Sequence, residues 1–398
     1  MAELTILQAV PRLDTGGSEQ AAIEIAEALT SAAAAALVAT EGGRMATAMT
    51  DAGGEVVALP MASKNPVTML ANARRLARLI EERGVDLVHA RSRAPAWSAL
   101  IAARRTGRPF VTTYHGAYSS VGPFKTFYNS VMARGDRVIA NSRYTADLIA
   151  ARHRVPKDRI RVIYRGVDLA KFAPESISPE RLARLRAAWG VSEGQPVVLQ
   201  AARLTSWKGQ PFVIEAARQL LAEYRLGDAV FVLAGDAQGR ESYRTELERL
   251  IAASGLDGRV KLPGHCDDMP AAFAIAQVGI IASTSAETFG RTSIEAQAMG
   301  CPIIVSDIGA APETILPAGR GKQDFTGWIV PCRDPAAIAE RVAEALALPP
   351  QQRAALAARA RRHAAAAFTL HHMQQATLAV YDELLGTTLA ARFGEVAV

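Results

Sequence analysis

Cysteine is scarce in this sequence, and its few cysteines are not spaced to bind metal or to form a disulfide framework. The chain has three, Cys266, Cys301 and Cys332, and no Cys-x-x-Cys pair or Cys/His ligand spacing accompanies them. This spacing excludes a disulfide-stapled secreted domain and a structural zinc site. We therefore expect a protein of the reducing cytosol.

Long hydrophobic runs are also missing. The segment 1–7 lacks a basic region followed by a long apolar stretch, and no window approaches the ~18 apolar residues of a membrane-spanning helix. The most apolar run, 32–39, is too short to span a bilayer. The sequence thus predicts neither a secretory signal peptide nor a transmembrane helix, and favours a cytoplasmic protein. Attachment to a membrane surface remains open.

Charge of one sign is only in slight excess. Lys plus Arg number 45 and Asp plus Glu number 39, which gives a net charge of +6. This small, dispersed surplus does not argue for a nucleic-acid partner, and an anionic small molecule or an acidic membrane surface explains it equally well. Since 49% of the residues are hydrophobic and 21% are charged, the chain has enough apolar surface to fold into globular domains.

The sequence contains no Asp-x-Asp pair and no HExxH or comparable metal-binding spacing. Carboxylates and histidines at such spacings commonly hold a divalent metal. We therefore expect no metal and no cofactor. A bound diphosphate would have to be neutralised by side-chain cations and backbone N–H groups.

Short β-branched runs alternate with longer helical patterns along the chain, which predicts two α/β sheets in series. The predicted strands are 4–10, 86–89, 109–113 and 137–140 in the first half, and 197–201, 229–234, 260–262, 278–282 and 302–305 in the second. The predicted helices include 19–29, 66–82, 144–151, 351–367 and 368–385, and 32–36 is expected to be a helix end or turn.

The length of 398 residues predicts two or three domains at roughly 100 to 200 residues each, and the repeated β/α rhythm favours two. The Pro-containing, charged segment 166–194 is expected to connect them. Ligands of doubly wound sheets bind at the carboxyl ends of the strands. We therefore expect the functional site in a cleft between the two domains, at those strand ends.

The most informative segment runs from Glu287 to Glu295, after the predicted strand 278–282, with a helix expected to begin at Gly290 or Arg291. A helix N-terminus in this position offers N–H groups to a phosphate or a sugar. On one continuous helix the two glutamates would lie ~12 Å apart, which suits grips on two parts of one ligand. The alternative is that Glu287 caps the helix and Glu295 is a solvated charge.

A second cluster, Arg203 to Gly209, follows the first strand of the second half. Arg203 and Lys208 could neutralise a diphosphate, the arginine through its planar fork and the lysine as a point charge. The alternative is that both cations are simply solvated.

Two features of the first half are candidates for binding a ligand at the carboxyl ends of the strands. Gly16 and Gly17 form a turn that opens a helix without the GxGxxG spacing of a dinucleotide site, and they serve either the backbone conformation or close approach to a ligand. His115 follows a buried strand and could donate a hydrogen bond to a sugar hydroxyl or steady a developing positive centre. A hydrogen-bonded core histidine is the alternative for His115.

Taken together, these segments resemble the family-4 retaining glycosyltransferases with the two-domain GT-B architecture. The motifs that carry the resemblance run in family order over nearly the whole chain: Gly16-Gly17, His115, Asn141-Ser142, Val162 to Asp168 with Phe172, Arg203 with Lys208-Gly209, Leu233 to Asp236, Gly264-His265, the E-x7-E stretch from Glu287 to Glu295, and Gly327 to Pro331. Three residues depart from the pattern: Arg291, in a position that the family usually fills with an apolar residue; Trp207, in place of a smaller or polar one; and Ala310, which follows Gly309 where a second glycine is common.

The resemblance implies a GT-B fold of two Rossmann-like, doubly wound domains that face each other across a cleft. An acceptor-binding domain would span 1–172, a nucleotide-sugar-binding domain 190–370, and a C-terminal helix over 371–398 would cross back to the first domain. His115, Glu287, Arg203 and Lys208 would be catalytic, with the cations on the diphosphate and Glu287 on the sugar hydroxyls. The implied donor-binding residues are Gly16, Gly17, Gly235, His265, Phe289, Gly290, Arg291, Ile294 and Glu295, with Glu295 on the ribose.

The implied function is retaining, metal-independent transfer of a hexose-type sugar from a nucleotide-diphosphate donor, UDP- or GDP-linked, to a glycan or lipid-linked acceptor. The N-terminal domain also resembles that of transferases of lipopolysaccharide and envelope-glycan synthesis. Arginines between 74 and 108, Arg91 among them, with Trp97, Phe124, Phe127 and Tyr128, could meet the anionic inner face of the membrane; the alternative is a solvated basic face. A sugar-nucleotide epimerase and a non-catalytic nucleotide-sugar-binding protein remain the alternative functions.

Overall fold

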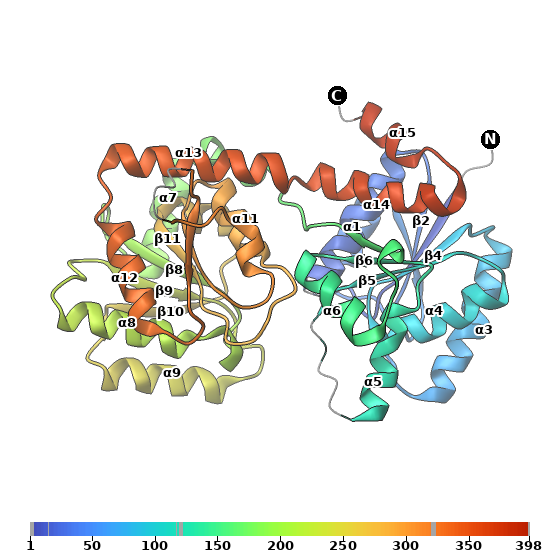
Figure 1. Ribbon diagram of the computed structural model, residues 1–398, viewed down its shortest axis with the longest axis horizontal. Helices are drawn as coiled ribbons and strands as arrows, with labels where there is room; N and C mark the ends of the chain where they lie inside the picture. The colour runs from blue at the N-terminus through green and yellow to red at the C-terminus, as the bar shows by residue number, and fades with distance from the viewer. Residues whose placement is uncertain (1–3, 15, 117, 119–121, 320–323, 397–398) are drawn as a thin grey trace. The chain divides into compact units, whose positions relative to one another are not determined.

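The structure is a computed structural model that describes residues 4–14, 16–116, 118, 122–319 and 324–396. The chain divides into two compact units (Figure 1). Unit 1 combines Met1–Tyr164 with the C-terminal segment Leu370–Val398, and unit 2 is Arg165–Thr369. The chain therefore leaves unit 1 once and returns to it.

Unit 1 is built on a seven-stranded parallel sheet in the order β3-β2-β1-β4-β5-β6-β7. Its strands are β1 (Thr5–Ala9), β2 (Ala35–Thr40), β3 (Gly54–Ala58), β4 (Leu87–Ala90), β5 (Phe110–Tyr114), β6 (Arg137–Ala140) and β7 (Ile160–Val162). Its helices are α1 (Gly17–Ser31), α2 (Ala46–Asp51), α3 (Pro66–Glu82), α4 (Arg93–Arg105), α5 (Pro123–Ser130), α6 (Arg143–His153), α14 (Leu370–Leu385) and α15 (Leu389–Val396).

Alternate residues of each strand supply the two cores of unit 1, because successive side chains of a strand point to opposite faces of the sheet. Ile6 of β1 packs with α1, α14 and α15 on one face. Its neighbour Leu7 packs with α3, α4 and α6 on the other. Both faces are covered, which is the usual state of a parallel sheet and explains why its strands are mainly apolar.

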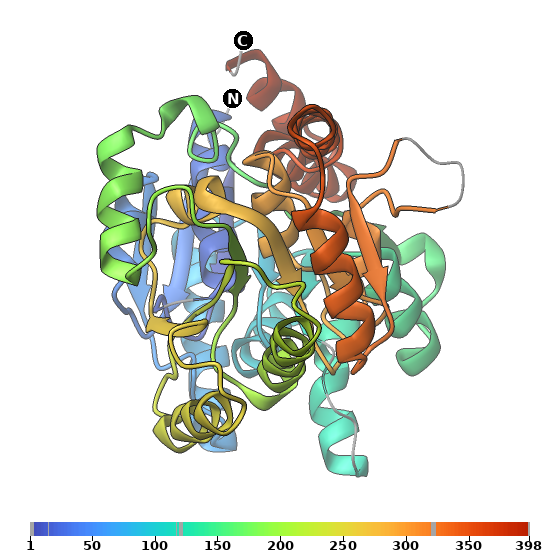
Figure 2. The ribbon, with the colours of Figure 1, turned by 90° about the vertical axis from the view of Figure 1, so that its left-hand side faces the viewer.

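Unit 2 repeats the plan with a six-stranded parallel sheet in the order β10-β9-β8-β11-β12-β13. Its strands are β8 (Val197–Ala201), β9 (Val230–Ala234), β10 (Val260–Gly264), β11 (Ala276–Ile281), β12 (Ile303–Ser306) and β13 (Gly327–Val330). Its helices are α7 (Pro179–Trp189), α8 (Gln210–Ala222), α9 (Glu241–Ala253), α10 (Met269–Ile275), α11 (Arg291–Ala298), α12 (Pro335–Leu346) and α13 (Pro350–Ala367). Helices α8, α9 and α12 pack on one face of the sheet, and Figure 2 has this unit toward the viewer.

The predicted fold class is confirmed, since both units are doubly wound parallel sheets. In each sheet the strand order reverses next to the first strand, between β1 and β4 in unit 1 and between β8 and β11 in unit 2. Loops that leave the carboxyl ends of two such strands part to opposite faces and open a crevice. The crevice of unit 2 lies between the two segments that the sequence singled out, after β8 and after β11.

All of the strands predicted from the sequence are present, but β2, β3, β7 and β13 were not predicted. The expectation of a helix end or turn over 32–36 is wrong for Ala35 and Ala36, which open β2. Alanine has little intrinsic preference for strands, and here burial between β1 and β3 decides. The other unpredicted strands are short or partly exposed: β3 and β7 each contain a charged residue, and β13 is apolar but has only 4 residues. No helix in the described part of the chain is long and apolar enough to cross a membrane.

Candidate active site

The loops after β8 and β11 are joined at the crevice of unit 2. Gly209 has φ +75°, and a Cβ atom built on it would lie 1.9 Å from the carbonyl oxygen of Ala282. The backbone N–H of Thr284 donates to the carbonyl of Trp207 at 2.8 Å. Only glycine permits this approach at position 209, both because the left-handed backbone favours it and because there is no room for a side chain.

The joined loops bring Lys208 and Glu287 into contact. Lys208 Nζ lies 2.8 Å from Glu287 Oε1, and the two side chains are only 16% and 15% exposed. The hydroxyl of Ser283 donates to the same carboxylate oxygen, and Lys208 Nζ lies 4.5 Å from the ring centroid of Trp207. The site therefore holds a cation and a carboxylate, both shielded from water, at the carboxyl ends of two adjacent strands.

The main chain of Glu287 is held by the loop after β12. Glu287 forms a parallel β-bridge with Gly309, and Ala310 N–H donates to the Glu287 carbonyl at 2.9 Å. Gly309 has φ +68°, and a Cβ atom there would lie 2.5 Å from the Glu287 carbonyl oxygen. Three strand-end loops thus fix the position of this carboxylate.

Glu287 precedes the helix that the sequence predicted, which begins at Arg291 as expected. The spacing of ~12 Å on a continuous helix therefore does not apply to Glu287 and Glu295, because Glu287 lies in the loop. Helix α11 has Gly290 as its N-cap and no side-chain cap hydrogen bond, so the structure also does not support Glu287 as a helix cap. Gly290 and Thr292 at the start of α11 line the same recess as Glu287, and the N–H groups of a helix start can serve an anion.

Lys208, Ser283, Glu287, Gly290 and Thr292 are among the residues that line this recess. Two predicted donor-binding residues of this segment have buried side chains. Ile294 is 0% exposed and Phe289 is 4% exposed, with the Phe289 ring 5.9 Å from that of Phe368. Such residues can offer only backbone groups to a ligand.

The remaining predicted residues of unit 2 lie around this pair. Arg291 Nε and Glu295 Oε1 form an ion pair of 3.4 Å within α11. Arg203 is exposed, and its Nη1 lies 3.4 Å from Gln238 Oε1. His265 is 67% exposed and lies 3.0 Å from Asp267. Within the residues that the structure describes, neither Arg203 nor His265 contacts Lys208 or Glu287.

Gly235 packs against the Arg203 loop. A Cβ atom at position 235 would lie 1.9 Å from the Ala202 carbonyl oxygen, and Leu204 N–H donates to the Asp236 carbonyl at 3.0 Å. Gly235 therefore holds the loop after β9 against the loop that carries Arg203.

In unit 1 the predicted residues also lie at carboxyl ends of strands. Gly16 is the N-cap of α1 in an extended conformation, and Gly17 is the first residue of the helix. Ser18 Oγ donates to Glu19 Oε2 at 2.7 Å, and a Cβ atom on Gly16 would lie 2.4 Å from that oxygen. The start of α1 is thus occupied by its own carboxylate. His115 directly follows β5 and is partly buried.

The structure corrects the placement of Arg91, which the sequence analysis grouped with a basic surface. Arg91 is 2% exposed, and its Nε donates to Gln8 Oε1 at 2.6 Å. Burial lowers the pKa of Arg91 and raises the pKa of Tyr381 on α14 to about 12. His89 joins the same network, with its ring nitrogens 2.6 Å from the Tyr381 hydroxyl and 2.7 Å from Thr113 Oγ1.

Ser283 and Gly309 are the site residues that sequence reasoning missed. A serine directly after a buried strand was a usable signal, because it places a hydroxyl at the ligand-binding edge. Gly309 was noted only for the alanine that follows it, and only the adjacency of β11 and β12 brings it against Glu287. In the described residues no group of three or more His, Cys, Asp or Glu side chains could hold a metal ion.

Two known families match this chain. Residues 15–171 match the family described as Glycosyltransferase Family 4, and residues 183–363 match Glycosyl transferases group 1. The chain belongs to the family-4 glycosyltransferases. This family membership confirms the resemblance drawn from the sequence, and both matches are to glycosyltransferases rather than to sugar-nucleotide epimerases.

Relatives of this glycosyltransferase include both curated proteins and solved structures. It is 31% identical to a GDP-mannose-dependent alpha-(1-6)-phosphatidylinositol monomannoside mannosyltransferase of Mycolicibacterium smegmatis, over 75% of this chain and 78% of the relative. A glycosyltransferase structure from Rickettsia africae ESF-5 has 32% identity and a TM-score of 0.88, over 98% of this chain and all of that one. Anabaena Alr3699/HepE in complex with UDP-glucose has 25% identity and a TM-score of 0.81, over 96% of this chain and all of that one. The GT-B architecture is therefore confirmed as well.

Proposed function

We propose that this glycosyltransferase moves a hexose-type sugar from a nucleotide-diphosphate donor to a glycan or lipid-linked acceptor, with retention of configuration and without a metal ion. The observation that carries the proposal is the shielded contact between Lys208 and Glu287 beside the N-terminus of α11. Departure of a nucleoside diphosphate leaves negative charge on its β-phosphate. A fixed cation and aligned N–H groups at that point lower the barrier to departure.

In this proposal, binding of the donor separates Lys208 from Glu287. The diphosphate accepts hydrogen bonds from Lys208 Nζ and from the first N–H groups of α11, and the exposed guanidinium of Arg203 turns toward the diphosphate as a second cation. Glu287, still held by Ser283 and by the Gly309 loop, then accepts hydrogen bonds from sugar hydroxyls. Glu295 binds the ribose, and His115 of unit 1 acts on the acceptor side of the reaction.

The relatives support the choice of donor and acceptor classes. The mycolicibacterial mannosyltransferase is named for a GDP-linked donor and a phosphatidylinositol-based acceptor, and the Anabaena protein binds UDP-glucose. We therefore assign a UDP- or GDP-linked hexose to unit 2 and favour a lipid-linked acceptor. A role in lipopolysaccharide or other envelope-glycan synthesis, at the inner face of the cell membrane, follows from that acceptor.

Donor binding is tested by thermal denaturation of the purified protein with UDP, GDP and their sugars, with EDTA present throughout. A ligand at 100 times its Kd stabilises the folded state by ~2.7 kcal/mol, which gives a clear rise in melting temperature. We expect one base to stabilise the protein in EDTA and Lys208→Met to lose the effect. No shift with any nucleotide would contradict the proposal and favour a non-catalytic relative, and a shift seen only with divalent metal would overturn metal independence.

Retention is tested separately, by NMR of the anomeric proton of the product formed from the donor identified above. We expect the product to have the anomeric configuration of the donor. An inverted product would overturn the retaining mechanism but leave donor binding intact.

A further inference from the structure

The recess of unit 2 is lined by a buried glutamine, Gln200 of β8. The polar side chains on this lining come from Gln200, Lys208, Ser283, Glu287 and Thr292. Gln200 is only 2% exposed, and no hydrogen-bond donor among the described residues reaches its Oε1. A buried acceptor that stays unpaired costs free energy, and native proteins pair nearly all such groups. The unpaired oxygen therefore points to a partner that arrives with the ligand.

The other end of the Gln200 amide holds the loop that carries Lys208. Gln200 Nε2 donates to the Lys208 carbonyl at 2.8 Å. Because a carbonyl only accepts, this contact identifies the amide end at the loop as the NH2 group and the other end as the oxygen. The loop is held further by the Thr284 N–H on the Trp207 carbonyl. The main chain of Lys208 is thus fixed, and its side chain is the part that can respond to a ligand.

Another buried glutamine of unit 2, Gln210, shows an amide with both ends paired. Its Nε2 donates to the Arg203 carbonyl at 3.0 Å, and its Oε1 accepts from the Tyr243 hydroxyl at 3.2 Å. Gln210 is 0% exposed and holds the same loop as Gln200. The two glutamines therefore differ in one respect that matters for a ligand, the unpaired Oε1 of Gln200.

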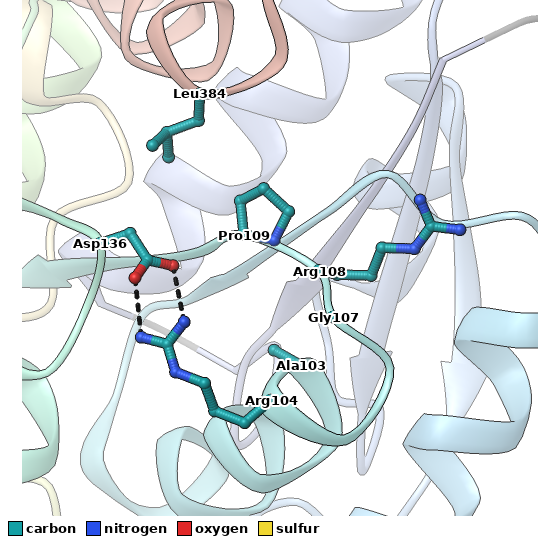
Figure 3. A pocket seen from close by; sticks show the side chains of 7 residues that line it. All are labelled: Ala103, Arg104, Gly107, Arg108, Pro109, Asp136 and Leu384. Atoms are coloured by element: carbon teal, nitrogen blue, oxygen red, sulfur yellow. Dashed lines mark hydrogen bonds and ion pairs between the residues drawn. The ribbon is translucent and has the colours of Figure 1, made fainter.

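A pocket of unit 1 beside α4 has its carboxylate paired as well (Figure 3). The two carboxylate oxygens of Asp136 accept from Arg104 at 3.0 and 2.7 Å, and Oδ2 also accepts from the Phe110 N–H at 2.8 Å. A ligand in that pocket would have to compete with Arg104 for Asp136. Gln200 Oε1, in the recess of unit 2, presents no such competition.

The Lys208 ammonium has three N–H donors and is shielded from water. One of its partners is Glu287 Oε1, at 2.8 Å, and the Trp207 ring centroid lies 4.5 Å away. In the proposed function, Glu287 turns to the sugar hydroxyls when the donor binds. The ammonium then loses its carboxylate while it remains shielded, and a shielded cation requires new hydrogen-bond acceptors.

We propose that Gln200 is a positioning residue for Lys208: when a diphosphate separates Lys208 from Glu287, the ammonium donates one hydrogen bond to the diphosphate and another to Gln200 Oε1. The amide then holds both the main chain and the ammonium of Lys208, which aims the cation at the phosphate. This arrangement pairs the buried oxygen and replaces the lost carboxylate in one step. It rests on the proposed function, because it requires a donor that draws Lys208 away from Glu287.

The test is isothermal titration calorimetry of the full-length protein with UDP and GDP in the presence of EDTA. Gln200→Met keeps an unbranched side chain but has no strong acceptor. We expect it to weaken binding of the nucleoside diphosphate roughly 10- to 100-fold, the effect of one hydrogen bond to a charged group. Affinity for uridine or guanosine, which carry no phosphate, should not change. In a Lys208→Met background, Gln200→Met should have no further effect, because the ammonium is absent.

Gln210→Met is the matched control, since it removes a buried glutamine that holds the same loop. Its melting temperature without nucleotide should fall like that of Gln200→Met, whereas its affinity for the nucleoside diphosphate should stay near the wild-type value. A crystal structure of the wild type with the nucleotide that binds tests the contact without any substitution. We expect Lys208 Nζ within ~3.2 Å of Gln200 Oε1 in that complex.

Unaltered diphosphate binding by Gln200→Met would overturn the proposal and leave a bridging water as the partner of Oε1. So would a complex in which Lys208 Nζ stays on Glu287, or an equal loss of affinity in Gln210→Met, since loosening of the loop would then explain the effect. Additive losses in Gln200→Met/Lys208→Met would assign Oε1 to the ligand itself. A wild type that binds neither nucleotide would refute the proposed function and this inference with it, whereas the other outcomes refute the inference alone.

Discussion

The contact between Lys208 and Glu287 should be both a stability feature of unit 2 and the source of its catalytic power. The perturbation is a double-mutant cycle of Lys208→Met, Glu287→Gln and the double variant, with Lys171→Met as the matched lysine control. Both side chains of the pair are about five-sixths buried. Removal of either partner therefore leaves the other with a poorly solvated charge.

The magnitude follows from that burial. A hydrogen bond to a charged group contributes ~1.5–3 kcal/mol to stability, well above the ~0–1 kcal/mol of an exposed ion pair. Each single substitution should therefore lower the free energy of unfolding of unit 2 by about 1.5–3 kcal/mol. The double variant should lose much less than the sum of the two singles, because the second substitution removes a charge that the first left unpaired.

Urea unfolding followed by tryptophan fluorescence is a suitable assay, since Trp189, Trp207 and Trp328 belong to unit 2 and only Trp97 belongs to unit 1. Lys171→Met should unfold like the wild type. In the transfer assay, Lys208→Met and Glu287→Ala should each reduce turnover by ~100-fold or more, as expected for loss of one preorganised charge-stabilising group. Additive losses of stability would refute the coupling of the pair, and near-normal turnover in both variants would refute the site.

Three further outcomes are expected. Gly209→Ala should destabilise unit 2 and abolish nucleotide-induced thermal stabilisation, because its Cβ atom would collide with the Ala282 carbonyl; unaltered stabilisation would show that the two loops need not touch. His115→Ala should reduce kcat more than the affinity for the donor, measured by single-turnover kinetics and equilibrium titration, and the reverse pattern would assign His115 to donor binding or structure. Burial lowers the pKa of His363 in α13, although its backbone bond to Thr314 opposes the shift. The unfolded chain therefore binds the proton more readily, and the stability of unit 2 should fall as the pH drops through the ordinary histidine range, near 6.5; His363→Phe should flatten that dependence in thermal melts from pH 8 to 5, and an unchanged slope would contradict the assignment.

The correct strand predictions came from short, mainly apolar runs between turn residues. Strands such as 197–201 and 229–234 are buried on both faces of the sheet. Nearly every position therefore carries an apolar side chain, which is visible in the sequence. Strands such as β3 and β13 were not predicted because edge position lets polar or exposed residues into them. The alanines of β2 have almost no intrinsic preference for a strand, so only pairing with the neighbouring strands β1 and β3 makes this segment a strand.

Individual residues of the candidate site were predicted from the positions of the predicted strands. Arg203, Lys208, His115 and Glu287 were singled out because each follows a predicted strand, and the carboxyl end of a parallel strand is where ligands bind. The spacing argument for Glu287 and Glu295 does not apply, because it was made for one continuous helix and the helix begins only at Arg291. Arg91 was placed on the surface because an arginine is seldom buried, and its partners Gln8 and Tyr381 lie far from it in sequence.

The sequence by itself determined the alternation of strands and helices, the two-unit organisation and the family, because these depend on local periodicity and on motifs in order along the chain. Only the tertiary structure decided that Lys208 and Glu287 meet, that Gly309 fixes Glu287, and that Arg91 is buried against Gln8. Each of these depends on which strands are neighbours or on how helices pack. Such long-range adjacency is set by the summed burial of whole elements, and no local stretch of sequence carries it.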